Sequence, residues 1–411
     1  MNYLDLLKKR NFFCLWFGQI ISQFGDRLTQ IALIGLVSKA TTSSTNLAFM
    51  LSMTIIPVFL FSPVAGVYVD RWDNRKTMYI SDFIRGIIIL LIPIIFEWTK
   101  CMPLIYIVIF FAFSVGRFFI PAKMALVPKL VEKKELFAAN SLISITATVA
   151  AILGIGVGGV IVETWGADIS FFIDSGTFFL SAISIIFIPI TVAGKFSSHD
   201  ILDIGKEIVV TVKKSVFVDI KESIKYVVLQ KETRYAFRIF LFLFSYAGAM
   251  FISIKFIQNV FASVTKDFGF MTLSLAVGIF IGSVIYGKIA HKFNPRKVIS
   301  SALMVASLYL IFFTIFLPRY PVISVGMLFA GFLGMIIAPV FVAANAMIHS
   351  YSDRDMLGRI FSFIELIGHM GFFISMFTFS FIADLAGTFT TLILVGIIGF
   401  CLAFMEHINN D

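Results

Sequence analysis

The sequence predicts an all-α membrane protein with twelve transmembrane helices in two six-helix bundles, related as a pseudo-two-fold repeat. Of its 411 residues, 59% are hydrophobic and only 14% are charged, which is more apolar surface than a soluble core can bury. The apolar runs are about 20 to 25 residues long, enough to cross roughly 30 Å of hydrocarbon as helices. A charged motif that follows the second run returns 221 residues later, after the eighth run.

The helices are expected to begin near residues 12, 46, 77, 102, 139, 168, 233, 268, 298, 321, 357 and 387. Residues 1–193 then form an N-terminal six-helix bundle, residues 194–232 a cytoplasmic linker and residues 233–411 a C-terminal six-helix bundle. In the linker, Ile and Val recur every three or four residues with lysines between them, which predicts an amphipathic helix on the membrane surface. A solvated linker helix with its apolar side on the protein fits the same pattern.

The basic residues predict how the chain is oriented in the cell membrane. Twenty-three Lys and Arg residues fall in the loops of one face and four in the loops of the other. Because cytoplasmic loops carry the excess of positive charge, both termini are expected in the cytoplasm. The net charge of +9 is spread between apolar runs, so we expect no nucleic-acid partner. Three separated cysteines, Cys14, Cys101 and Cys401, indicate no disulfide framework and no metal site, and no cofactor is expected.

The repeated motif reads GVYVDRWDNRK at Gly66–Lys76 and GKIAHKFNPRK at Gly287–Lys297. Its glycine allows two helices to approach closely, and its charges can meet a helix terminus or one another. We therefore expect a cytoplasmic latch that biases the conformational equilibrium. The alternative, simple orientation signals, explains Arg75 and Lys76 well but Asp70 poorly. The expected latch residues are Gly66, Asp70, Arg71, Arg75, Lys76, Gly287, Arg296 and Lys297.

The first copy resembles the loop motif Gly-x-x-x-Asp-Arg-x-Gly-Arg-Arg/Lys of the major facilitator superfamily. Asp73 stands where that motif has its second Gly, and since Asp tolerates left-handed backbone, we expect the turn to persist. The segment VDRWDNRK is similar to the drug and macrolide efflux branch. The resemblance implies the major facilitator fold and a monomeric secondary transporter that exports a small hydrophobic or amphiphilic molecule, with protons as the coupling ion.

Two other segments widen the comparison. LGIGVGGV resembles an antiporter motif at Gly154, Gly158 and Gly159, but Ile155 replaces its proline, so close helix packing explains the glycines as well. The segments SQFGD and IPAKMALVPKLVEKKELFAANSL resemble lysophospholipid transporters. A lysophospholipid transporter is therefore the alternative within the same class.

Polar residues inside the apolar runs mark the expected transport pathway. A charge within the membrane is costly, so each one is expected to serve a function. Gln19, Gln23, Asp26 and Gln30 share one helical face beside Arg27, which predicts either a water-filled cavity or a polar seam between helices. Further pathway candidates lie in later helices: Arg117, Lys255, Asn259, Glu365 and His369.

Within this set, Asp26 and Glu365 are the expected proton carriers. Glu365 and His369 lie one turn apart and could pass a proton or simply pair. Asp82 and Arg85, three residues apart, are expected to pair with each other. A cavity holding both Asp26 and Lys255 would accept a cationic or a zwitterionic substrate.

The sequence contains no credible set of nucleophile, base and acid, so an enzyme is not expected. A membrane scaffold or sensor that transports nothing remains the alternative from another class. The buried charges favour the transporter, because a scaffold has no evident use for them.

Overall fold

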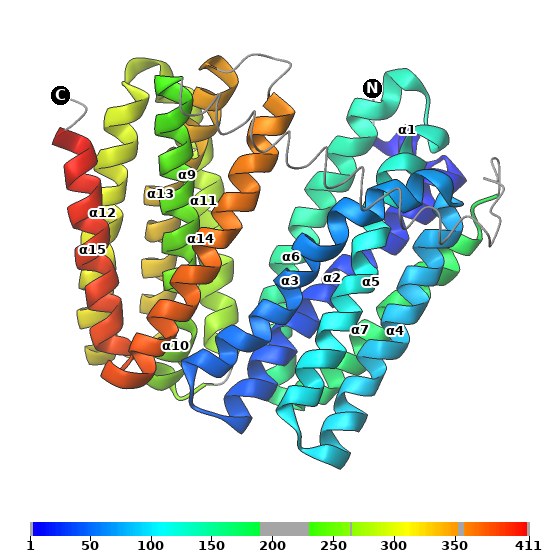
Figure 1. The fold of residues 1–411 in the computed structure, drawn as a ribbon, viewed down its shortest axis with the longest axis horizontal. Coiled ribbons are helices and arrows are strands. Elements are labelled where there is room, and N and C mark those ends of the chain that lie inside the picture. Colours follow the sequence, from blue (N-terminus) through cyan, green and yellow to red (C-terminus); the bar gives the residue numbers. More distant parts are fainter. Residues whose placement is uncertain (1–2, 190–229, 264, 352–356, 409–411) are drawn as a thin grey trace. The chain divides into compact units, whose positions relative to one another are not determined.

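The computed structural model describes residues 3–189, 230–263, 265–351 and 357–408. In this part of the chain the regular structure is helical throughout, and no strand occurs (Figure 1). The helices fall into two compact units: a first half, residues 1–40 and 49–214, and a second half, residues 41–48 and 215–411. Most of the expected amphipathic linker, residues 194–232, lies outside the described residues, so its helix stays a prediction.

The helices that carry the first half are listed here in chain order: α1 (Tyr3–Leu7), α2 (Arg10–Ala40), α3 (Ser44–Arg71), α4 (Asn74–Thr99), α5 (Met102–Leu130), α6 (Leu136–Trp165) and α7 (Ala167–Ile186). A 3-10 turn, Lys133–Glu135, precedes α6. The first turn of α3 groups with the second half.

The second half contains the following helices: α9 (Lys231–Met250), α10 (Ser253–Phe261), α11 (Lys266–Ile289), α12 (Pro295–Phe316), α13 (Ile323–Tyr351), α14 (Leu357–Ala386) and α15 (Thr388–Ile408). The predicted seventh helix is thus interrupted after Met250 and continues as α10. Short 3-10 turns follow α11 and α12, at Ala290–Lys292 and Leu317–Arg319.

Eleven helical segments among the described residues are long and apolar enough to cross a membrane. The long helix α2 is not among them because its glutamines and charges lower its hydropathy, although 31 residues span about 46 Å. All twelve predicted starts lie within three residues of a helix start. The structure confirms the predicted all-α, multi-pass membrane architecture.

Three helix pairs recur at equivalent positions in the two halves. In the first half, α2 packs on α6, and α4 packs on both α5 and α7. The equivalent pairs in the second half are α9 with α14, and α12 with both α13 and α15. Tandem repetition of this kind is common in transporters, and here it follows the repeat of the charged motif.

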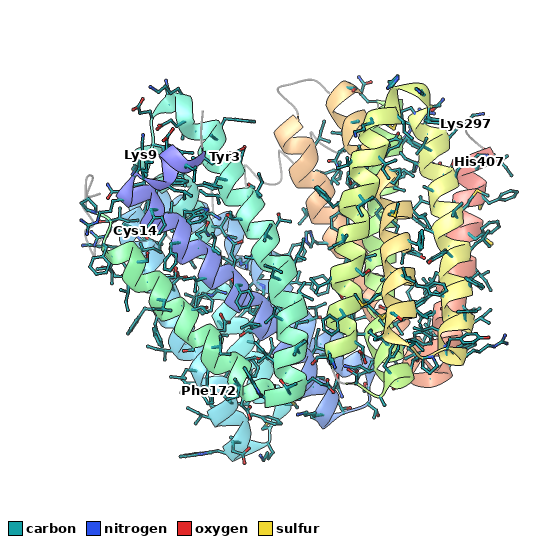
Figure 2. The ribbon with its side chains drawn as sticks, turned by 180° about the vertical axis from the view of Figure 1, so that it is seen from behind. Tyr3, Lys9, Cys14, Phe172, Lys297 and His407 are labelled. Atoms are coloured by element: carbon teal, nitrogen blue, oxygen red, sulfur yellow. The ribbon has the colours of Figure 1, made fainter. Side chains whose placement is uncertain are left out.

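Buried apolar side chains pack between the helices within each half (Figure 2). Phe12, Phe171 and Phe178 are fully buried in the first half. Lys297 at the start of α12 and His407 at the end of α15 lie at the same end of the second half, where the His407 ring nitrogen Nδ1 is 2.9 Å from the Ser300 hydroxyl. Helix ends that are distant in the sequence therefore meet through polar contacts.

The charged motif forms a helix cap in both halves. Asp73 has extended backbone, φ −68°, and its Oδ1 accepts hydrogen bonds from the backbone N–H groups of Arg75 and Lys76 at 3.0 and 3.1 Å. Asn294 likewise accepts from the N–H of Arg296 at 3.0 Å at the start of α12. Asp73 does not use left-handed backbone at this position, because it satisfies the unpaired N–H groups of the next helix from an extended conformation instead.

Candidate functional site

A polar cavity of about 210 Å³ lies within the first half, between α2, α4 and α5. Its polar lining consists of amide, hydroxyl, carboxylate and basic groups: Gln19, Ser22, Gln23, Asp26, Arg27, Gln30, Asp82, Arg85, Arg117 and Lys123. An apolar wall completes it: Phe113, Gly116, Phe119 and Ile120. Every polar residue predicted on the first helix, together with Arg117, therefore lines a single cavity.

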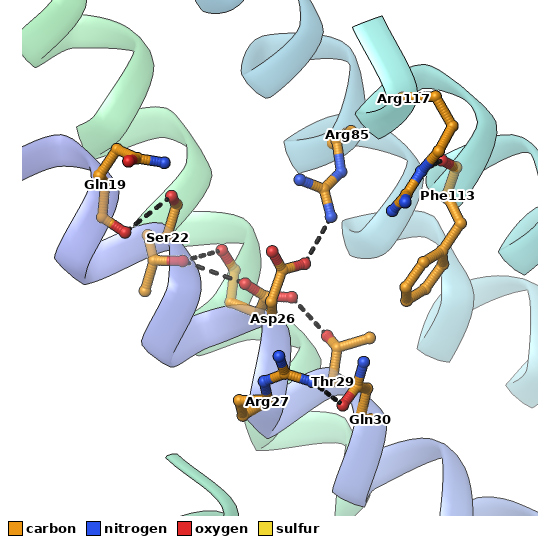
Figure 3. A network of polar contacts seen from close by, with 11 residues as sticks. Gln19, Ser22, Asp26, Arg27, Thr29, Gln30, Arg85, Phe113 and Arg117 are labelled. Atoms are coloured by element: carbon orange, nitrogen blue, oxygen red, sulfur yellow. Dashed lines mark hydrogen bonds and ion pairs between the residues drawn. The ribbon is translucent and has the colours of Figure 1, made fainter. Parts of the chain in front are cut away.

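An ion pair joins two walls of this cavity (Figure 3). The Arg85 guanidinium on α4 donates through Nη2 to Oδ1 of Asp26 on α2. Arg85 also lies over the Phe178 ring, with 4.1 Å from the guanidinium carbon to the ring centroid. Its side chain is only 9% exposed, whereas that of Asp26 is 28% exposed. Asp26 is thus the partner of the pair that water and small ligands reach more readily.

The expected local pairing of Asp82 with Arg85 is not the ion pair that forms. The Asp82 carboxylate instead accepts a hydrogen bond at 2.6 Å from the Ser181 hydroxyl on α7. Asp82 still attracts Arg85 electrostatically, as does Asp174. Tertiary packing brings Asp26 to Arg85, and spacing along one helix could not foresee that choice.

A second buried carboxylate, Asp174 on α7, lies behind α2. It accepts hydrogen bonds from the hydroxyls of Thr29, at 2.5 Å, and Thr177, at 3.0 Å. Gly25 makes this approach possible, because a Cβ at that position would lie 2.2 Å from an Asp174 oxygen. The hydroxyl partners compensate part of the cost of burying this carboxylate.

The basic residues of the cavity differ in how well they are paired. The Arg27 guanidinium donates to Oε1 of Gln30 at 2.7 Å. Arg117 donates through Nε to the backbone oxygen of Phe113 at 3.3 Å. Among the described residues, Lys123 has no hydrogen-bond or ion-pair partner. Sequence reasoning missed Lys123, although its place six residues after Arg117 on the same apolar run was a usable signal.

The other pathway candidates lie in the second half. The Lys255 amine on α10 donates to the backbone oxygen of Thr41 at 2.9 Å, and Asn259 lies one turn further along that helix. On α14, the His369 ring packs against Phe244 with 5.2 Å between ring centroids. Glu365 belongs to the same helix, but its side chain lies outside the described residues. Its proton-carrying role stays a prediction.

Beside Lys255, Asp384 near the end of α14 caps α3. Its carboxylate accepts from the backbone N–H groups of Ser44 and Thr45, at 2.6 and 3.1 Å, and from the Ser43 hydroxyl at 2.7 Å. A carboxylate here also opposes the positive N-terminus of α3. The first turn of α3 is therefore held by a residue far along the chain.

The predicted latch is described only in part. The Arg75 guanidinium donates to the backbone oxygens of Ile185, at 3.3 Å, and Ile186, at the C-terminus of α7. The Arg296 guanidinium lies 4.9 Å from the Tyr235 ring centroid. A Cβ at Gly287 would have no neighbour within 4 Å, so close helix approach does not explain this glycine. Lys76 and Lys297 are exposed.

For three latch residues, Gly66, Asp70 and Arg71, the side-chain surroundings lie outside the described residues. Their part in the latch stays a prediction.

The glycines of α6 lie against α2, the helix that carries the cavity's polar face. A Cβ at Gly154 would be 2.7 Å from the Cβ of Arg27, and one at Gly158 would be 3.1 Å from a methyl of Leu28. Gly159 is buried on the same helix. This close contact is the geometry that small residues allow in membranes.

A second cavity, about 330 Å³, lies in the second half between α9, α10, α11, α12 and α13. Its lining is almost entirely apolar, with a few hydroxyls such as those of Tyr246 and Ser307. In the described part of the chain, no group of three or more His, Cys, Asp or Glu residues could hold a metal ion.

Comparison with known proteins identifies the family. A family model described as the Major Facilitator Superfamily matches residues 15–339. The MFS-type transporter YkuC of Bacillus subtilis (strain 168) is 27% identical over 87% of this chain and 82% of its own. A protein of the same organism named as a bacilysin exporter, BacE, is 25% identical over 85% of this chain and 83% of its own. Macrolide efflux protein A of Streptococcus pyogenes is 21% identical over 98% of this chain and 96% of its own.

Solved structures share the fold at low identity. A bacterial homologue of the human lysosomal transporter Spinster superposes with a TM-score of 0.73 at 10% identity, covering 97% of this chain and 95% of its own. A bacterial homologue of the iron transporter ferroportin gives 0.72 at 11% identity, with 97% and 98% covered. Because the family model spans most of the sequence and these structures repeat its helical architecture, the chain belongs to the Major Facilitator Superfamily.

Proposed function

We propose that this transporter exports a small amphiphilic molecule from the cytoplasm in exchange for protons, by alternating access. The observation that carries the proposal is the Asp26–Arg85 ion pair in the wall of the polar cavity. A charge pair within the membrane is costly, and in transporters such residues mark ion and substrate pathways. The relatives named as a bacilysin exporter and a macrolide efflux protein support export over import.

The ion pair suggests how a proton acts. Protonation of Asp26 removes the charge that attracts Arg85, and the cation remains compensated because Asp82 and Asp174 also attract it. The proton therefore changes the cavity's charge by one without leaving a buried cation isolated. If the two conformations of the protein hold this proton with different affinity, the pH gradient shifts their populations.

The orientation follows from the basic loops. If the protein lies in a bacterial plasma membrane with both termini on the cytoplasmic side, the motif residues Arg75 and Arg296 lie at the cytoplasmic ends of their helices. Arg75 binds two carbonyls at the end of α7. Such a contact can be made in one conformation and broken in the other, as a latch requires.

Transport in proteoliposomes tests the proposal. The cytoplasmic face points outward, the lumen is acidic, and three fluorescent amphiphiles of permanent charge are followed: a quaternary-ammonium dye, a sulfonated dye and a labelled lysophosphatidylcholine. Permanent charge prevents passive redistribution by the pH gradient. We expect gradient-driven accumulation of at least one probe, lost in Asp26→Asn. Accumulation that is independent of the pH gradient and unchanged in Asp26→Asn would refute proton-coupled export. Movement of the labelled lysophosphatidylcholine alone would favour a lysophospholipid transporter.

A further inference from the structure

The charges of the polar cavity do not cancel, and the surplus bears on what it binds. Four cationic side chains line the cavity, but only two carboxylates do. The cations are Arg27, Arg85, Arg117 and Lys123, and the carboxylates are Asp26 and Asp82. Counting Asp174 behind α2 still leaves one positive charge in excess. Unbalanced charge at membrane depth is expensive, so a ligand that supplies a negative group would stabilise the occupied cavity.

The surplus is concentrated on α5. Arg117 donates through Nε to the backbone oxygen of Phe113, and its terminal Nη atoms have no hydrogen-bond partner among the described residues. Asp26, the carboxylate that attracts Arg117, is already the ion-pair partner of Arg85. Lys123 lines the same cavity with no partner in the described part of the chain. These donors form a ready site for a carboxylate or phosphate.

The opposite wall offers an acceptor. Asp26 uses Oδ1 for Arg85, while Figure 3 draws no contact from its other carboxylate oxygen. That oxygen can bind a proton or the ammonium group of a ligand. Since both walls bound a cavity of about 210 Å³, one small head group can reach both.

We infer that the substrate is a zwitterion, with its ammonium at Asp26 and its carboxylate or phosphate at Lys123 and Arg117. This inference rests on the proposed function. A purely anionic ligand would bind more tightly once Asp26 is protonated, which opposes proton exchange. An ammonium group instead competes with the proton for the same oxygen, as exchange requires.

The size of the cavity shows which part of the substrate it takes. At about 210 Å³ it is smaller than the roughly 300 to 1,000 Å³ of sites that enclose a drug-sized ligand. It therefore receives the charged head group. Phe113 and Ile120 on the apolar wall are placed to contact the start of the hydrophobic portion.

Thiol protection in lipid nanodiscs tests the inference without any gradient. The three native cysteines are replaced by serine, and Ile120→Cys places a reporter in the cavity wall. The ligands share a dodecyl chain: dodecyltrimethylammonium, dodecyl phosphate, and two zwitterions, dodecylphosphocholine and N-dodecyl-N,N-dimethylglycine. We expect both zwitterions to protect the thiol at concentrations roughly 10-fold lower than either ligand that carries charge of only one sign, because a zwitterion makes an ionic contact at each end of the site. The tighter zwitterion identifies phosphate or carboxylate as the preferred anion.

Two substitutions should separate the ends of the site. Lys123→Gln should weaken protection by the zwitterions and the phosphate roughly 10-fold and leave the ammonium ligand unchanged. Asp26→Asn should weaken the zwitterions and the ammonium ligand but not the phosphate. Lys123→Arg keeps the positive charge and should bind the zwitterions and the phosphate as the parent protein does. Lys129→Gln should change nothing, because Lys129 is exposed on the same helix.

The outcomes are distinguishable. Equal protection by ammonium and zwitterion, with no effect of Lys123→Gln, would overturn the inference even if gradient-driven transport is found. The expected pattern of protection without any gradient-driven transport would instead support the zwitterion site and refute proton-coupled export. Since the comparison of ligands on the parent protein already tests the inference, a variant that fails to fold does not remove the test.

Discussion

Removing the charge of Arg85 tests whether its guanidinium holds the first half together. Arg85 is 9% exposed at its side chain, pairs with Asp26, and is attracted by Asp82 and Asp174, so Arg85→Gln leaves three carboxylates without their shared cation. Breaking a buried pair by removing one partner costs about 3 to 5 kcal/mol. We therefore expect an apparent Tm in detergent lower by on the order of 10 °C for a unit of this size.

The matched control is Arg238→Gln, because Arg238 forms an exposed ion pair with Glu406 at 3.1 Å, a contact expected to contribute about 0 to 1 kcal/mol. A deficit no larger than that of the control would refute the role assigned to Arg85.

Three further substitutions test the packing and the caps, each by thermal unfolding in detergent. Gly278→Ala places a Cβ 1.9 Å from the Gly331 carbonyl oxygen, so it should destabilise the second half by about 1 to 3 kcal/mol. Gly176→Ala, in α7 with open space around it, should be neutral or stabilise by up to about 1 kcal/mol, because Ala is the better helix former; equal effects would contradict the packing. Asp73→Ala should lose about 1 kcal/mol by removing the α4 cap, and Asp73→Asn should retain most of it. Asp384→Ala should lose a similar amount at the start of α3, and an unchanged Tm would argue against that cap.

Hydropathy and repetition were sufficient to predict most of the fold. Helix starts follow from where apolar runs meet charge, Gly or Pro, which explains their agreement to within three residues. The interruption between α9 and α10 was not predicted, because the residues around Phe251 carry no Pro and continue the apolar run. The caps by Asp73 and Asn294 were available in the sequence, since each precedes a helix start, yet resemblance to a glycine motif obscured them.

The candidate site was predictable along one helix and not between helices. The spacing of Gln19, Gln23, Asp26 and Gln30 indicated a polar face, and the structure places that face on a cavity. The pairing could not be predicted from the sequence. Asp82 is the nearest carboxylate to Arg85 along the helix, but α2 and α4 both pack on α7, and Asp26 on α2 becomes the ion-pair partner. Which charges face one cavity is a property of tertiary packing, and a periodic pattern contains no information about it.

The most direct test of the central claim is the lumen pH of proteoliposomes whose cytoplasmic face points outward. No gradient is imposed at the start, and the amphiphile that the wild-type protein accumulates is added outside while a trapped pH-sensitive dye is read. Exchange through Asp26 predicts that the lumen becomes alkaline as the amphiphile enters, with no change in Asp26→Asn and a normal response in Arg238→Gln. Entry of the amphiphile without a pH change in the wild type, or an undiminished pH change in Asp26→Asn, would contradict proton exchange at this site.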